Sequence, residues 1–411
     1  MNLAVVVQRY GASIVGGAEA LARTVATLLA AAHRVTVVTT TATDYGTWRN
    51  ALPAGEERDG AVGVLRFPVE RERPSSWAEL NGLLYGGLAQ TFPTLGRLQK
   101  RALERRLAAW PVALQEEYLR LQGPYSPALL AWLDEHEAGY DRFLFFTYLY
   151  ATTYFGMHCV RGDKVDFYPT LHDEPPAYLP VFGRLFRRAS RLLFSTTGEL
   201  RVAQRLHPFE PARAIVVGYG AREPAPPSVL PLETPYLLYA GRIDPAKGVA
   251  LLLEQFIRWR REQPQPRVRL VLIGERLMDL PDHPDVEYLG FRSEGEKAAL
   301  MRQALALVHP SPFESLGLVL IEAFLCGTPG LVFGRNEILV DHCRAANGGL
   351  WYDDYAELAA ALSWLVSHPE DAKVLGAQGY AYARRHYAFA GYRRRLAALY
   401  PGDGSGTGAP R

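Results

Sequence analysis

The feature that most constrains the fold is an alternation of short apolar segments with helical segments, which runs through both halves of the chain. The apolar run at 3–7 is followed by a small-residue loop and a helical stretch at 18–32. The other strands expected in the first half lie at 34–39, 62–67, 142–146, 166–170, 191–194 and 214–217. Continuous apolar runs of this length are typical of buried parallel strands.

The alternation stops at a proline-rich stretch, 223–235, and then starts again. In the second half, strands are expected at 236–239, 267–273, 286–289, 305–309 and 330–333, and helices at 249–260, 294–304 and 318–325. Strands that alternate with helices predict a doubly wound parallel sheet. We therefore expect an α/β protein with two Rossmann-like domains.

The boundaries follow from these patterns. The N-terminal domain is expected over 1–222 and the C-terminal domain over 236–385, with 223–235 as the linker. Within the first domain, 71–139 has helical rather than alternating character and is expected to be a helical insertion. The glycine-rich tail, 402–411, is expected to be disordered.

Composition excludes several classes of protein. The net charge of +2 argues against general nucleic-acid binding, which needs a basic excess. The three cysteines are odd in number and lack metal-ligand spacing, which favours a cytoplasmic protein without a disulfide framework. The most apolar window, 316–333, is interrupted by Glu322, Gly327 and Pro329, so it is not expected to span a membrane.

Two glutamates eight positions apart, Glu314 and Glu322, lie in an otherwise apolar stretch. Because an unpaired buried carboxylate is costly, two of them in such a stretch suggest a site. We expect Glu314 in a loop and Glu322 about two turns into the following helix, both directed towards a cleft. The alternatives are a helix-start carboxylate for Glu314 and an exposed helical residue for Glu322.

Two cations, Arg242 and Lys247, follow the expected strand 236–239 in a loop bracketed by Gly241 and Gly248. Positioned cations stabilise the negative charge that develops on a diphosphate leaving group. The alternative is a pair of solvated surface side chains. Ligands of an open parallel sheet bind beyond the carboxyl ends of its strands, so loops of both domains could serve one cleft.

A weaker pattern follows the first strand. Gly16 and Gly17 precede a helix, and glycines at a helix start let the backbone approach a phosphate. The alternative is a common Gly-Gly turn, in which Glu19 is an ordinary first-turn glutamate.

After the strand at 166–170 come His172, Asp173 and Glu174. A histidine beside two carboxylates could position a sugar hydroxyl or transfer a proton. The alternative is a capped turn before Pro175, with Asp173 bonded to its own backbone.

The helical insertion contains a basic stretch. Its cations are Arg97, Lys100, Arg101, Arg105 and Arg106, with Leu98, Leu103, Leu107 and Trp110 interleaved. We favour a solvated amphipathic helix. The alternative is a surface for an anionic lipid-linked acceptor or for an acidic membrane face.

Together these residues resemble family 4 of the retaining glycosyltransferases, which have the GT-B architecture. The Glu-x7-Glu pattern matches Glu314 and Glu322, and the Arg-x4-Lys pattern matches Arg242 and Lys247. The Gly-Gly-x-Glu and His-Asp elements described above match as well. One departure is 218–222, which reads Gly-Tyr-Gly-Ala-Arg where many relatives carry Pro-Asn-Gly-Val-Asp.

The resemblance implies a role for each residue. Arg242 and Lys247, with Gly16 and Gly17, hold the donor diphosphate. The catalytic residues implied are Glu314, His172 and Asp173. The residues implied around the donor sugar and ribose are Phe313, Glu314, Ser315, Leu316, Gly317, Leu318 and Glu322. The nucleobase is expected near Gly274, Glu275 and Leu289, and the helix at 386–401 is expected to return to the first domain.

The activity implied is a retaining, metal-independent transfer of a sugar from a nucleotide diphosphate to a saccharide or lipid-linked acceptor. The absence of an Asp-x-Asp pattern agrees with a reaction that needs no metal. A UDP-sugar is the first co-substrate to test, and bacterial surface polysaccharide or glycoconjugate synthesis is the expected setting. The alternatives are a nucleotide-sugar epimerase, a phosphorylase, or a non-catalytic nucleotide-binding protein. We expect a cytoplasmic location, with peripheral contact at the inner membrane face as an open alternative.

Overall fold

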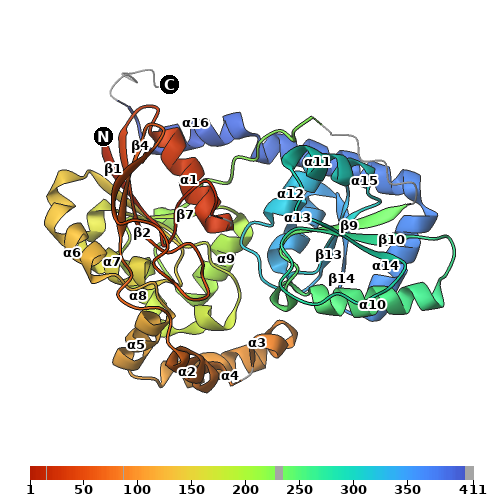
Figure 1. Cartoon of the computed structure of the whole chain (residues 1–411), viewed down its shortest axis with the longest axis horizontal. Coiled ribbons are helices and arrows are strands. Elements are labelled where there is room, and N and C mark those ends of the chain that lie inside the picture. The colour runs from red at the N-terminus through yellow and green to blue at the C-terminus, as the bar shows by residue number, and fades with distance from the viewer. Residues whose placement is uncertain (15, 87, 227–234, 403–411) are drawn as a thin grey trace. The chain divides into compact units, whose positions relative to one another are not determined.

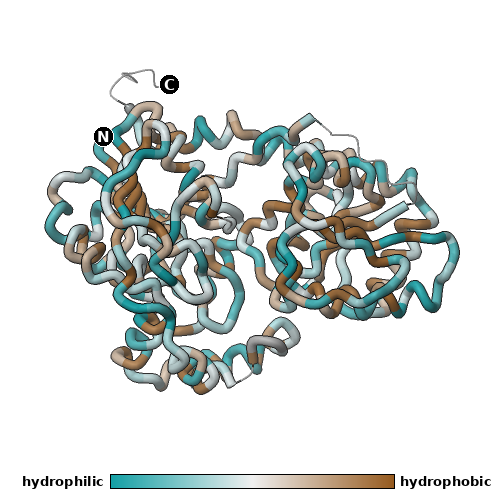
Figure 2. Tube along the Cα trace, viewed as in Figure 1, coloured by the Kyte–Doolittle hydropathy of each residue, from teal (hydrophilic) through white to brown (hydrophobic). Residues whose placement is uncertain are grey.

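The computed structural model describes residues 1–14, 16–86, 88–226 and 235–402. These residues form two compact units. Unit 1 consists of Met1–Gly218 together with the C-terminal segment from Tyr392, and unit 2 consists of Tyr219–Gly391. Figure 1 shows the elements of each unit, and Figure 2 shows that hydrophobic residues gather along the strands.

The sheet of unit 1 has eight strands in the order β3-β4-β2-β1-β5-β6-β7-β8. Their bounds are β1 Asn2–Val6, β2 Arg34–Thr40, β3 Gly55–Asp59, β4 Val62–Phe67, β5 Arg142–Phe146, β6 Val165–Tyr168, β7 Arg191–Phe194 and β8 Ala214–Val216. All pairs are parallel except β3 with β4. The edge strand β3, Gly-Glu-Glu-Arg-Asp, was not predicted because it has no apolar face.

Helices cover this sheet and also form the predicted insertion between β4 and β5. The covering helices are α1 Gly17–Leu29, α7 Ala151–Cys159, α8 Gly183–Arg188 and α9 Thr197–Leu206, with short 3-10 turns at Gly162–Lys164, Pro175–Tyr178, Pro180–Phe182 and Pro211–Arg213. The insertion contains α2 Ser75–Tyr85, α3 Leu88–Thr91, η1 Phe92–Thr94, α4 Arg97–Ala108, α5 Val112–Gln122, α6 Pro127–His136 and η2 Glu137–Gly139. In Figure 1, α2 to α5 gather apart from the sheet, whereas α6 lies against α7.

Unit 2 has six parallel strands in the order β11-β10-β9-β12-β13-β14. Their bounds are β9 Tyr236–Ala240, β10 Arg269–Ile273, β11 Val286–Gly290, β12 Leu307–His309, β13 Gly330–Phe333 and β14 Gly349–Tyr352. The helices are η7 Pro245–Lys247, α10 Val249–Glu262, α11 Glu294–Gln303, α12 Leu318–Leu325, α13 Glu337–Ala346, α14 Tyr355–Ser367 and α15 Pro369–Tyr387. The fold class predicted from the alternation is confirmed.

The unit boundaries differ from the expected ranges. The change from unit 1 to unit 2 falls after Gly218, because the backbone N–H of Ala221 donates to the carbonyl of Tyr387 at 2.8 Å and ties this turn to unit 2. Part of the expected linker, 227–234, and almost all of the expected tail, 403–411, lie outside the described residues.

The last helix, α16 Phe389–Leu399, belongs to unit 1 from Tyr392 onward. The Tyr400 hydroxyl donates to the fully buried carboxylate of Asp166 at 2.7 Å, and Arg191 donates to the carbonyl of Leu399 at 3.0 Å. The return begins at Tyr392 rather than at residue 386, where we expected it.

A membrane-spanning helix would need to be long and apolar, and none of the helices in the described residues meets both conditions.

Candidate active site

The strand order of unit 2 places two loops at its topological switch point. Counted within the unit, the order is 3-2-1-4-5-6, so the chain turns in opposite directions on either side of the neighbouring strands β9 and β12. Ligands of doubly wound sheets bind where the loops after two such strands separate. These are the loops that carry Lys247, after β9, and Glu314, after β12.

The loop after β9 is built to lie against the loop after β12. Asp244 begins η7 by accepting a hydrogen bond from the backbone of Ala246 at 2.9 Å. Gly248 has φ 77°, and a Cβ there would lie 2.4 Å from the carbonyl oxygen of Pro310. Only glycine permits this conformation and this close approach together. Arg242 is partly buried, and its carbonyl accepts from the Tyr239 hydroxyl at 2.5 Å.

An ion pair joins the two loops. The Lys247 Nζ lies 2.7 Å from the Glu314 Oε1, and these side chains keep 28% and 18% of their surface exposed. His309, at the end of β12, lies with its Nε2 3.9 Å from the same oxygen. Burial lowers the pKa of His309 to about 4, so the imidazole is neutral at pH 7. Its buried Nδ1 has no hydrogen-bond partner among the described residues.

Side chains of α13 and of its N-cap residue hold the Glu314 loop in place. His342 donates from Nε2 to the carbonyl of Leu316 at 2.8 Å and accepts at Nδ1 from the Tyr382 hydroxyl, 3.0 Å away. This tautomer follows from the partners, because a carbonyl can only accept. Burial lowers the pKa of His342 to about 4. Asn336 donates to the carbonyl of Ser311 at 3.3 Å, at the start of the same loop.

The residues expected around the donor sugar all lie on this loop or on α12. The Ser311 hydroxyl donates to the carbonyl of Phe313 at 3.1 Å. Gly317 adopts φ 69° as the N-cap of α12, which begins at Leu318. The first backbone N–H groups of that helix therefore start beside Ser315 and Leu316.

Glu322 pairs with a lysine that the sequence analysis missed. The Lys297 Nζ, on α11, lies 3.1 Å from the Glu322 Oε2. Burial raises the pKa of Glu322, and the charge of Glu322 raises the pKa of Lys297 against the effect of burial. Burial, helped by Glu322, raises the pKa of Tyr219 to about 12. The sequence contained a signal for this lysine, because Lys297 directly precedes the apolar run 298–301 within the expected helix 294–304.

The two glutamates therefore have different cations, because Glu314 is paired with Lys247 and Glu322 with Lys297. The role of Arg242 and Lys247 as ligands of the donor diphosphate stays a prediction.

The residues expected near the nucleobase lie at the carboxyl ends of β10 and β11. A Cβ on Gly274 would lie 2.1 Å from the carbonyl oxygen of Gly241, so the loops after β9 and β10 are in direct contact. The backbone N–H of Ile243 donates to the carbonyl of Glu275 at 2.8 Å. Leu289 is partly buried within β11.

In unit 1, Gly16 is required by its contact with the buried side chain of Glu19. Glu19 is buried and ion-paired with Arg9, and it also accepts from Gln8 at 3.0 Å. A Cβ on Gly16 would lie 2.1 Å from the Glu19 Oε2. Gly16 therefore makes room for a carboxylate that folds back on the helix start. The role of Gly16 and Gly17 in phosphate binding stays a prediction.

Asp173 is an anchor between elements of unit 1. Its Oδ2 lies 2.8 Å from Lys100 and 2.9 Å from Arg205, and its Oδ1 accepts from the Tyr178 hydroxyl at 2.7 Å. The carboxylate thus holds three side chains of unit 1 together. The role of Asp173 as a catalytic residue stays a prediction.

His172 pairs instead with Glu174. The His172 Nδ1 lies 3.5 Å from the Glu174 Oε1, which accepts from the Tyr148 hydroxyl at 2.7 Å. The side chain of His172 keeps 30% of its surface exposed.

The backbone beneath His172 is strained. Thr147, after β5, and Thr170, after β6, have φ 68° and φ 45°, which is unfavourable for β-branched residues. Their hydroxyls lie 3.2 Å apart. Backbone strain of this kind concentrates at functional sites.

The buried carboxylate of Glu199 holds the same part of the chain, because it accepts from the backbone of Leu171 at 3.0 Å and of Ser195 at 2.9 Å. Burial raises the pKa of Glu199 to about 7.

Among the described residues, no group of three or more His, Cys, Asp and Glu side chains is arranged to hold a metal ion.

Comparison with solved structures shows which fold this protein has. The fold is GT-B, with two Rossmann-like units. The structure matches sucrose-phosphate synthase from Thermosynechococcus elongatus with a TM-score of 0.67 at 17% identity, covering 97% of this chain and 98% of that chain. It matches Anabaena HepE in complex with UDP-glucose with a TM-score of 0.65 at 16% identity, covering 97% and 99%.

Sequence comparison gives a narrower result. Residues 222–382, which lie within unit 2, match the family model of the glycosyl transferases group 1. D-inositol 3-phosphate glycosyltransferase of Kineococcus radiotolerans is 31% identical over 255 residues, which are 53% of this chain and 58% of the relative. The enzyme of the same name from Thermobispora bispora is 28% identical over 260 residues, or 56% and 60%. The chain thus spans less than two thirds of the curated relatives that it matches.

Proposed function

We propose that this protein is a glycosyltransferase that moves a sugar from a nucleotide diphosphate to an acceptor hydroxyl. The observation that carries the proposal is the Lys247–Glu314 pair at the topological switch point of unit 2. The match of 222–382 to the glycosyl transferases group 1 covers both residues of this pair.

The chemistry proposed for unit 2 follows from its charges. Lys247 and Arg242 stabilise the charge that gathers on the diphosphate as the glycosidic bond breaks. In this proposal Glu314 contacts the sugar hydroxyls, and Glu322, which is paired with Lys297, binds the ribose hydroxyls. The backbone N–H groups at the start of α12 suit anionic oxygens.

We further propose retention of configuration without a metal ion, as in the family 4 enzymes that the motifs resemble. The attacking hydroxyl enters on the face from which the diphosphate leaves, and a phosphate oxygen accepts its proton. In this proposal His172 of unit 1 contacts the donor sugar.

The substrates are also proposals. UDP is the first nucleotide to test, because one of the matching structures is Anabaena HepE in complex with UDP-glucose. A saccharide or lipid-linked acceptor, surface polysaccharide or glycoconjugate synthesis and a cytoplasmic location complete the proposal. Another matching structure, WaaG, is described as involved in lipopolysaccharide biosynthesis.

The test is calorimetric titration of the purified protein with UDP, GDP, ADP and dTDP in the presence of a chelator. We expect one nucleotide to bind and Lys247→Ala to weaken its binding at least tenfold. The matched control is Lys373→Ala, which removes a lysine from an exposed pair with Glu370, also at 2.7 Å. Binding that is equally strong in Lys247→Ala would reject the site, and the absence of binding by all four nucleotides would reject the proposed donor class.

A further inference from the structure

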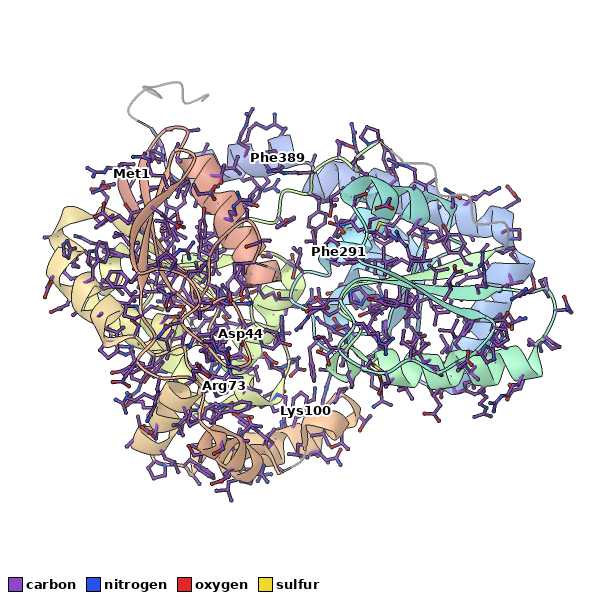
Figure 3. All side chains as sticks on the ribbon, in the orientation of Figure 1. Met1, Asp44, Arg73, Lys100, Phe291 and Phe389 are labelled. Carbon is purple, nitrogen blue, oxygen red and sulfur yellow. The ribbon has the colours of Figure 1, made fainter. Side chains whose placement is uncertain are left out.

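Helix α4 has an inner side that is fixed to the His172 loop. Lys100, labelled in Figure 3, lies 2.8 Å from Asp173 and 4.6 Å from the centre of the Phe92 ring. Leu103 and Leu107 on the same side are buried. Because Asp173 directly follows His172, this helix is attached to the loop that carries the histidine.

The opposite side of α4 is exposed. At 100° per residue, five residues share about 140° of arc on that side. They are Arg97, Leu98, Arg101, Ala102 and Arg105, all exposed, and we call them the α4 outer face. Leu98 is 78% exposed. None of these three arginines forms an ion pair within the part of the chain that the structure describes.

The surroundings of this face add to its character. Leu83, 70% exposed, lies on α2, whose end contacts α4 because Arg106 donates to the carbonyl of Leu84 at 2.7 Å. Glu104 is the one acidic residue of α4. Glu104 is exposed and lies between Lys100 and Arg97 on the helical wheel, at the border of the outer face. The outer face therefore combines three arginines that form no ion pair among the described residues with one exposed leucine, Leu98, and Leu83 is a second exposed leucine on the neighbouring helix α2.

We propose that the α4 outer face docks on the surface of a lipid bilayer that carries anionic headgroups. Arginines are attracted to such a surface, and exposed leucines enter the boundary between headgroups and acyl chains. A site for single-stranded nucleic acid would instead present aromatic side chains for stacking. Docking through α4 would bring the attached His172 loop close to the membrane.

This inference rests on the proposed function only for its purpose, which is access to a lipid-linked acceptor. The docking itself needs no nucleotide sugar. Vesicle binding and nucleotide binding can therefore be measured separately on the same preparation.

The experiment is co-sedimentation of the full chain with phosphatidylcholine vesicles, with and without phosphatidylglycerol. We expect binding to the anionic vesicles, weakened by added salt, and little binding to the neutral ones. A cation at such a surface contributes about fivefold to binding. Removing three cations would cost on the order of a hundredfold, so the charge-reversing triple variant Arg97→Glu, Arg101→Glu, Arg105→Glu should lose at least that much.

Two further variants make the result specific. Arg34→Glu, Arg261→Glu, Arg394→Glu changes the net charge equally at exposed positions on β2, α10 and α16, and should bind as the native protein does. Leu98→Ser leaves every charge in place and should weaken binding severalfold. Because Leu98 is exposed, this variant keeps the fold, as circular dichroism would show.

Three results would overturn the proposal. They are native-level binding by the outer-face triple variant, an equal loss in the control triple variant, and retention on a heparin column without vesicle binding. The last would assign the face to a soluble polyanion. A protein that binds anionic vesicles but no nucleotide would keep the docking surface and reject the proposed donor class.

Discussion

At the scale of single residues, the charge of Glu314 competes with a donor for Lys247. The two side chains are 2.7 Å apart, and both remain partly exposed. In the proposed reaction a diphosphate binds the same ammonium group, so the Glu314 carboxylate opposes nucleotide binding. The same carboxylate is proposed to contact the sugar hydroxyls. A neutral isostere separates these two effects.

For Glu314→Gln we therefore expect UDP affinity that is unchanged or up to tenfold higher, and a kcat at least a hundredfold lower. Calorimetry and initial rates with UDP-sugars measure the two quantities. Glu370→Gln, in the exposed pair with Lys373, is the control and should change neither. A loss of UDP affinity as large as that of Lys247→Ala would contradict this account of Glu314.

Glu174 is a candidate positioning residue for His172. The carboxylate lies 3.5 Å from Nδ1 and is itself held by Tyr148. A carboxylate beside Nδ1 favours the proton on that nitrogen and leaves Nε2 as the acceptor.

We expect Glu174→Gln to give a mixture of His172 tautomers where the native protein shows the Nδ1-protonated form. Nitrogen-15 NMR of labelled histidine distinguishes the two forms, and His172→Gln assigns the signal. An unchanged tautomer in Glu174→Gln would show that Glu174 does not orient the ring. This test does not depend on turnover.

At the scale of elements, glycine conformations decide how the loops of unit 2 meet. Gly248 and Gly290 have almost the same φ, 77° and 78°. A Cβ at Gly248 would strike the Pro310 carbonyl, whereas nothing lies within 4 Å of a Cβ at Gly290. The pair therefore separates backbone strain from the contact between loops.

Gly290→Ala should lower the free energy of unfolding by about 1 kcal/mol through its left-handed backbone alone. Gly248→Ala should lower it further and should also weaken UDP binding at least tenfold, because the Lys247 loop must move away from the Glu314 loop. Urea unfolding and calorimetry report the two effects. Equal stability and equal UDP affinity in the two variants would show that the loop contact does not matter.

At the scale of the whole molecule, buried titratable groups give the two units different responses to acid. Burial lowers the pKa of His309 and His342 in unit 2 to about 4. The unfolded chain takes up these protons near pH 6.5, so unit 2 loses stability as the pH falls from about 6.5 to about 4. Each histidine contributes about 3 kcal/mol over that range.

Unit 1 contains two groups that oppose each other. His207, with its pKa lowered to about 4 by burial, acts in the same direction as the histidines of unit 2. Glu199, with its pKa raised to about 7 by burial, takes up its proton in the folded state first. It therefore adds stability as the pH falls from about 7 to about 4.5, and it offsets His207.

In unit 2, Glu322, whose pKa is raised by burial, opposes two histidines, whereas in unit 1 Glu199 opposes one. We therefore expect unit 2 to lose more stability than unit 1 between about pH 7 and about pH 5. Pulse proteolysis in urea, with the fragments of each unit identified by mass spectrometry, measures both. His342→Gln keeps a donor for the Leu316 carbonyl and should reduce the pH dependence of unit 2. Equal losses in the two units would contradict the assignment of these pKa shifts.

Much of the fold was predictable because strand and helix patterns are local. The ranges Val62–Phe67, Arg142–Phe146 and Leu318–Leu325 were predicted to the residue, since each has an uninterrupted apolar or helical pattern. The strands β3 and β14 and the helix α13 were missed. In β3 the reason is its polar edge position, which leaves no hydrophobic periodicity to detect.

The sequence by itself determined the two α/β units, the helical insertion and the loops that carry Lys247 and Glu314. Only the tertiary structure decided the partners: Lys297 with Glu322, Lys100 with Asp173, Glu19 with Arg9, and Glu199 beneath the His172 loop. The physical reason is that hydrophobic periodicity depends only on residues that are close together in the sequence. The partner of a buried charge comes instead from whichever distant element the packing brings beside it.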